Sequence, residues 1–87
     1  MDKARLVAAA SEATAGHGGE RPLAPEEVGR VFDAVFGTVE RPGAIAQALR
    51  RGETVSLGSF GGFHSEDGTA AFRPGTALTE YLRDRVR

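Results

Sequence analysis

The chain contains no cysteine and no tryptophan. The lack of cysteine excludes disulfide bonds and thiolate-ligated zinc, which stabilise many short chains. The two histidines, His17 and His64, lie far apart without the spacing of metal ligands, so we expect no metal site and no cofactor. At 87 residues the chain has room for one domain, whose own core would be marginal. Association with a second chain is therefore the expected source of additional burial.

The sequence also lacks a long apolar run and a strong excess of one charge. No apolar segment is long enough to cross a bilayer, and the start of the chain does not have the pattern of a signal peptide, so we expect a cytoplasmic protein without a membrane partner. The formal net charge of −1 opposes nucleic-acid binding, since Lys and Arg supply most non-specific affinity for DNA. From Phe72 onward four arginines face only two acids. These arginines either form a weak phosphate-binding patch or are placed near a helix C-terminus, where the helix dipole favours positive charge.

Hydrophobic spacing predicts helices in the first half of the chain. Asp2 is a plausible N-cap for a helix over about 2–14, which glycines near residue 16 would end. Pro25 suits the first position of a second helix. Because Pro42 has no N–H to donate, we expect that helix to kink or end there and a short helix to restart over about 44–51. The second helix carries an apolar stripe at helical spacing, comprising Val28, Val31, Phe32, Val35, Phe36 and Val39.

The pattern changes to a period of two from Thr54, which predicts strands. Asp67-Gly68 is typical of a two-residue hairpin turn with positive φ at both positions, and this turn would place Phe63 opposite Phe72. A last helix from about Thr76 carries apolar residues at helical spacing: Leu78, Tyr81, Leu82 and Val86. The order of elements predicts an α+β domain over 1–87, with a helical part over 1–52, a sheet over 53–73 and a C-terminal helix over 75–86.

Four blocks of the sequence, taken together and in order, resemble the bacterial histone-like HU/IHF family. They are residues 1–7 (MDKARLV), 32–36 (FDAVF), 51–63 (RGETVSLGSFGGF) and 71–78 (AFRPGTAL). The resemblance implies an HU/IHF-like fold with two N-terminal helices, a short three-stranded antiparallel sheet and a C-terminal helix, in an intertwined homodimer. It also implies a non-catalytic, nucleoid-associated protein that binds DNA without sequence preference.

The chain departs from the family at the arm, which in the family is long, basic and proline-tipped and kinks DNA from the minor groove. The eight residues between Phe63 and Phe72 include two acids and no lysine, arginine or proline. Pro42-Gly43 also looks like an insertion in the family's second helix. A member with a truncated arm is expected to bend DNA little and to bind it weakly, with a dissociation constant of roughly 10⁻⁴ M at physiological salt.

The resemblance also implies site residues. Lys3 and Arg73 match basic positions of the family, and Thr76 stands where the family has a basic residue. With Arg50 and Arg51 they are the candidate DNA contacts; the alternative for each is a solvated surface residue. The expected dimer core, which one chain could not cover, comprises Val31, Phe32, Val35, Phe36, Phe60, Phe63, Phe72 and Leu78.

Two other classes of function compete with DNA binding. The first is a dimerisation or protein-interaction module without an arm, which pairs with an HU-type protomer or another protein and does not bind DNA; Glu66 and Asp67 at the hairpin tip favour it. The second is an enzyme. The turn at 58–62 lacks the lysine and helix start of a phosphate-binding loop, and no serine has a histidine and an acid in a recognisable order. We therefore expect no catalytic activity and no small-molecule substrate.

Overall fold

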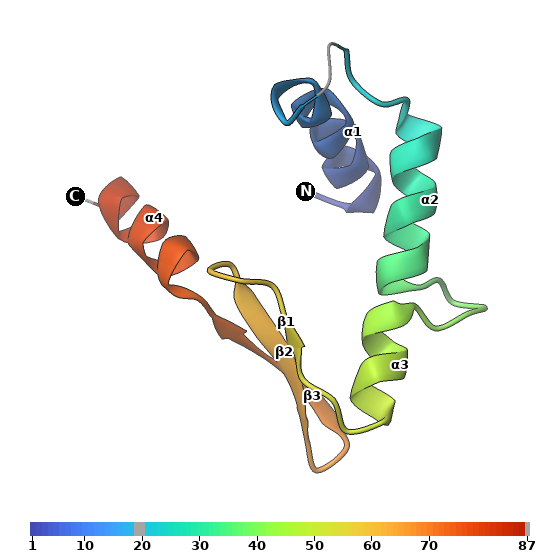
Figure 1. The fold of residues 1–87 in the computed structure, drawn as a ribbon, viewed down its shortest axis with the longest axis vertical. Coiled ribbons are helices and arrows are strands. Elements are labelled where there is room, and N and C mark those ends of the chain that lie inside the picture. Colours follow the sequence, from blue (N-terminus) through green and yellow to red (C-terminus); the bar gives the residue numbers. More distant parts are fainter. Residues whose placement is uncertain (19–20, 87) are drawn as a thin grey trace. The chain divides into compact units, whose positions relative to one another are not determined.

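The computed structural model describes residues 1–18 and 21–86, with side chains described through Asp84. It divides into two compact units, Met1–Gly43 and Ala44–Arg87, and each is described here by itself (Figure 1). The first unit holds two α-helices, and the second holds a helix, three strands and a last helix. The expected α+β class and order of elements are confirmed. That both units form one domain stays a prediction.

In the first unit, α1 (Lys3–Ala13) and α2 (Pro25–Phe36) are joined by a connection that begins with a 3₁₀ turn, Thr14–Gly16. Asp2 is the N-cap of α1, as expected, because its carboxylate accepts a hydrogen bond from the N–H of Arg5 at 2.9 Å. The N–H of Leu23 donates to the hydroxyl of Thr14 at 2.8 Å. This bond ties the segment before α2 to the end of α1. Pro25 is the first residue of α2, as its fixed φ favours.

The predicted end of α2 was wrong. The helix ends at Phe36 rather than near Pro42, because Gly37 adopts a φ of 87° that leaves the helical region. The loop closes on itself: the N–H of Thr38 donates to the carbonyl of Arg41 at 2.8 Å, and a Cβ on Gly37 would lie 2.5 Å from the backbone N of Gly43. Val39, assigned to the apolar stripe, lies outside the helix and is fully exposed.

The second unit begins with α3 (Ala44–Arg50), which contacts β1 (Val55–Ser56) and β2 (Gly61–Glu66). With β3 (Thr69–Pro74) these strands form an antiparallel sheet in the order β1-β2-β3, and α4 (Thr76–Val86) follows. Phe63 pairs with Phe72, and Asp67 and Gly68 have φ values of 50° and 79°. Both the predicted register and the predicted hairpin turn are confirmed.

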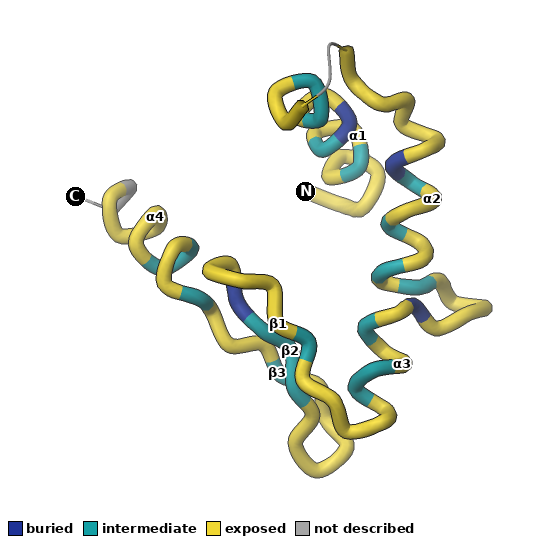
Figure 2. Tube along the Cα trace, in the orientation of Figure 1, coloured by how far each residue is buried: buried dark blue, intermediate teal, exposed yellow. Residues whose placement is uncertain are grey.

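Little of the described chain is buried (Figure 2). Val28, with 6% of its surface exposed, is the one apolar side chain classed as buried among those the structure describes. The rings of Phe60 and Phe63 both lie against that of Phe72, with centroid distances of 5.6 and 5.1 Å. Phe32 and Phe36 form a second pair at 5.5 Å. Within the described ranges, no helix is long and apolar enough to cross a bilayer.

Candidate nucleic-acid interface

The sheet of the second unit has one polar face. Side chains of a strand alternate between the two faces, and the register pairs Ser56 with Gly62 and Gly62 with Arg73. These three residues therefore share a face with His64 and Glu66. We call this side of the sheet the polar face. The opposite face carries the paired rings of Phe63 and Phe72.

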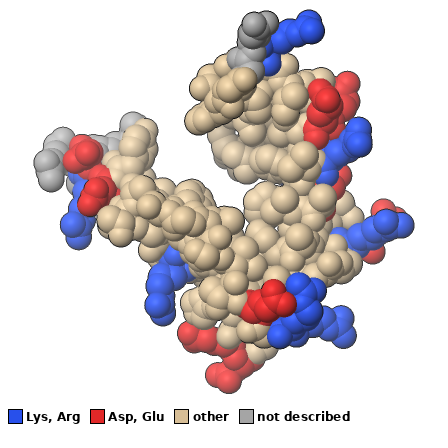
Figure 3. All heavy atoms as spheres, viewed as in Figure 1, with Lys and Arg blue, Asp and Glu red and all other residues tan. Residues whose placement is uncertain are grey.

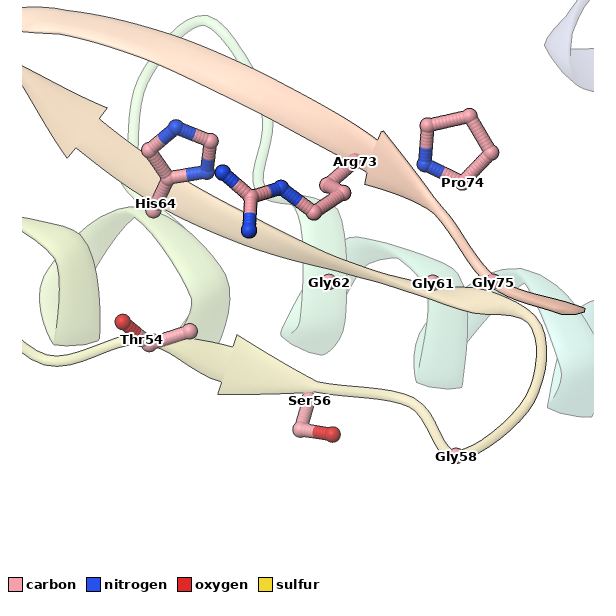
Figure 4. Close-up of a pocket in the computed structure, with 9 residues that line it drawn as sticks. All are labelled: Thr54, Ser56, Gly58, Gly61, Gly62, His64, Arg73, Pro74 and Gly75. Atoms are coloured by element: carbon pink, nitrogen blue, oxygen red, sulfur yellow. The ribbon is translucent and has the colours of Figure 1, made fainter.

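The polar face contains an open hollow of about 490 Å³ (Figure 4). Gly61 lies in its wall at a φ of 150°, and a Cβ there would come within 2.5 Å of the Phe72 ring. A side chain at this position would displace either the ring or the strand, so the strand start needs glycine. The hollow is lined by Thr54, Ser56, Gly58, Gly61, Gly62, His64, Arg73, Pro74 and Gly75.

The side chains around the hollow are suited to an anion. Arg73 extends from β3 across β2, and its guanidinium points toward the ring of His64 (Figure 4). Thr54 and Ser56 add hydroxyl groups from the β1 side. Guanidinium and hydroxyl groups donate hydrogen bonds to phosphate oxygens, and arginine keeps its charge at all physiological pH values. Within the described residues, no three His, Asp or Glu side chains are grouped so that they could hold a metal ion.

The polar face carries one permanent cation and one carboxylate. Arg73 is exposed and forms no ion pair with any residue that the structure describes. His64 is half-buried, and its Nε2 lies 3.0 Å from Oε1 of Glu66. While the imidazole is neutral, the charges of Arg73 and Glu66 offset each other.

Two other candidate cations are held by carboxylates. Nζ of Lys3, at the start of α1, is paired with Asp33 on α2. Nε of Arg51 donates to Oε2 of Glu53 at 2.7 Å. This hydrogen bond, and the guanidinium charge behind it, hold the pKa of Glu53 below its ordinary value and raise that of Arg51. All four side chains are about half exposed or more, so solvent screens both pairs.

The remaining candidates, Arg50 and Thr76, are exposed. Arg50 ends α3 and has no carboxylate partner in the described part of the chain; Thr76 is the first residue of α4. Lys3 thus lies in the first unit, and the other four candidates lie in the second. On the face drawn in Figure 3, acidic and basic side chains lie near one another within each unit. The second unit has six arginines and five acids in its sequence, whereas the first has five basic and seven acidic residues.

Sequence reasoning missed His64 as a site residue. The candidate contacts named from the sequence do not include it, and Glu66 was considered for binding only as part of the acidic hairpin tip. The predicted register carried the missing signal, because pairing Phe63 with Phe72 also puts His64 and Arg73 on one face.

Comparisons with known proteins agree with this architecture. No protein-family model and no curated protein matches the chain. Among solved structures, the chain is similar to an HU mutant from Thermotoga maritima, with a TM-score of 0.70 and 25% sequence identity. The match covers 94% of this chain and 99% of that chain. The chain therefore has an HU-like fold, as its four sequence blocks predicted.

Proposed function

We propose that this chain is a nucleoid-associated protein of the bacterial cytoplasm that binds double-stranded DNA as a homodimer. Binding is non-catalytic and independent of sequence, through phosphates laid on the polar face. The observation that carries the proposal is Arg73, an exposed arginine without an ion-pair partner among the described residues, on the hollow polar face of an HU-like fold.

The dimer is supported by the apolar surface that one chain leaves uncovered. Val31 and Phe36 on α2 are 58% and 55% exposed, and Phe60 is 51% exposed. Burying such surface contributes about 25 cal/mol per Å², and a second copy would cover it. The eight residues of the expected core all have apolar surface to bury: Val31, Phe36, Phe60 and Phe72 are exposed, and Phe32, Val35, Phe63 and Leu78 are half-buried.

The state of each candidate cation supports weak binding. Arg73 and Arg50 are available to phosphates, and Thr76 offers a hydroxyl. Lys3 and Arg51 must leave Asp33 and Glu53 before they contact DNA. The hairpin between β2 and β3 ends in Glu66 and Asp67, which a phosphate backbone would repel. We infer an affinity of roughly 10⁻⁴ M at physiological salt and little bending of the duplex.

The test is a fluorescence-anisotropy titration of a labelled duplex at low and moderate salt. The wild type should bind at low salt and lose affinity as salt rises. R73Q should weaken binding and reduce the slope of log K against log salt by about one for each Arg73 removed. R41Q, which removes the same charge from the exposed loop of the first unit, is the control and should bind like the wild type. Absence of binding even at low salt would refute the proposal.

The second candidate function is a protein-interaction module that keeps the dimer and does not bind DNA. The acidic tip of the β2–β3 hairpin is the observation that favours it, because Glu66 and Asp67 suit a basic partner. One such partner is a basic HU-type protomer, in a heterodimer. Co-expression with that protomer and size-exclusion chromatography would test it. A heterodimer, together with a homodimer that leaves the duplex unbound, would favour this candidate over the first.

A further inference from the structure

We propose that His64 is a protonation-dependent phosphate ligand on the polar face, so that the affinity for duplex DNA rises as the pH falls. This inference rests on the proposed function, since it concerns the same face of the sheet. It adds a regulated contact to the permanent one at Arg73. The ligand is a phosphodiester group of the DNA backbone.

The position of His64 supports this role. Arg73 pairs with Gly62, which is two residues from His64 on β2, so the two side chains are diagonal neighbours on one face. Both line the same hollow, and the guanidinium points toward the imidazole (Figure 4). A phosphate held by Arg73 would therefore lie within reach of the imidazole.

The bond to Glu66 determines what the ring offers to that phosphate. Neutral imidazole has one N–H and one lone pair. With the proton on Nε2 donated to Glu66, Nδ1 is an acceptor and repels a phosphate oxygen. Protonation adds an N–H at Nδ1 while the bond to Glu66 is kept. The ring then binds the carboxylate and the phosphate at the same time.

Protonation of His64 also raises the net charge of the polar face, which favours phosphate binding. Glu66 on β2 is its carboxylate neighbour, and Arg73 is the cation that β3 contributes. β1 presents the hydroxyl group of Ser56 on this face, and α3, which contacts β2, carries Arg50 as its one charged residue. With a neutral ring, Arg73 and Glu66 balance; with an imidazolium, the face has a net charge of +1. Histidine is the side chain that ordinarily changes charge between pH 5 and 8.

The test is the duplex titration at pH 6 and pH 8 with constant ionic strength. The wild type should bind at least about fivefold more tightly at pH 6, since each linked proton changes affinity by up to tenfold per pH unit. H64Q should bind equally at both pH values. H64K keeps a permanent cation beside Glu66 and should bind at pH 8 as tightly as the wild type does at pH 6. H17Q removes the other histidine and should keep the wild-type pH dependence.

Proton NMR of the ring supplies a second readout that does not depend on a variant. DNA should raise the pH midpoint of the His64 resonance, because a ligand that prefers the protonated form stabilises it. H17Q assigns the resonance. Circular dichroism at both pH values checks that each variant is folded.

The outcomes separate the two proposals. A wild type that binds DNA equally at pH 6 and pH 8, an H64Q that keeps the pH dependence, or a midpoint that DNA leaves unchanged would overturn the role of His64 and leave DNA binding through Arg73 standing. A wild type that binds no duplex at either pH, even at low salt, would overturn both.

Discussion

At the residue scale, cations of the same type differ in whether a carboxylate holds them. Arg51 is paired with Glu53, whereas Arg73 has no such partner in the described part of the chain. E53Q removes the carboxylate and frees Arg51 for phosphate. We expect about a two- to fivefold gain in duplex affinity at low salt, because non-specific affinity follows the available cations. Anisotropy titration measures the gain. E12Q changes net charge equally on α1 and should give a smaller effect; an equal gain in both variants would contradict the account.

The same pair predicts how Glu53 titrates. Its pKa lies below the ordinary value of 4.5 because Arg51 stabilises the carboxylate. Both partners of the ion pair are therefore charged above pH 4.5. The small contribution of the pair to stability is lost as the pH falls through the lowered pKa of Glu53. NMR titration of the Glu53 side chain should give a midpoint below 4.5 in the wild type and a higher midpoint in R51Q. An unchanged midpoint in R51Q would show that the pair does not form in solution.

At the scale of elements, the junction of β3 and α4 depends on a glycine. The N–H of Gly75 donates to the carbonyl of Phe60 at 2.8 Å, and that of Ala77 donates to Ser59 at 3.1 Å. These bonds hold the start of α4 against the turn between β1 and β2. A Cβ on Gly75 would lie 2.1 Å from the carbonyl oxygen of Ser59. The junction therefore has no room for a side chain.

G75A should accordingly lower the free energy of unfolding by about 2 kcal/mol or more, because the backbone atoms that it meets cannot move aside cheaply. Thermal unfolding followed by circular dichroism measures the change. G16A is the matched control, since a Cβ at Gly16 meets no atom within 4 Å. Equal stability of G75A and the wild type would contradict the described junction.

The elements also show what could be predicted from the sequence. The hairpin and its register depend on Asp67-Gly68 and on two nearby phenylalanines, which are local signals that a sequence displays. The end of α2 was mispredicted because Val39 continues the helical spacing and hides the stop at Gly37. The pair between Lys3 and Asp33 joins residues that are thirty positions apart, so spacing along the chain does not reveal it.

Part of the candidate site could also be predicted from the sequence, namely the part that depends on local signals. Arg73 and Thr76 follow from the resemblance of one short block, and the structure places both at or next to the end of β3. The role of His64 depends on the partner of its Nε2 and on a neighbour from another strand. Alternation along β2 places Glu66 on the face of His64, but Arg73 reaches that face only through the pairing of β2 with β3, which one strand does not display.

In the whole molecule, we expect a second copy of the chain to cover the exposed apolar side chains. Val31 is 58% exposed on α2 and is assigned to the dimer core. V31D should weaken the dimer by about tenfold or more, since it places a charge in an apolar interface. Sedimentation velocity over a concentration series detects the change. V39D introduces the same charge at a fully exposed residue outside α2 and should leave the dimer intact.

Sedimentation equilibrium of the wild-type chain at micromolar concentration is the decisive measurement of the proposed dimer, because the proposed interface exists only if two protomers share their apolar surfaces. We expect a single species of twice the 9.1 kDa chain mass. A stable, well-folded species at 9.1 kDa would contradict it.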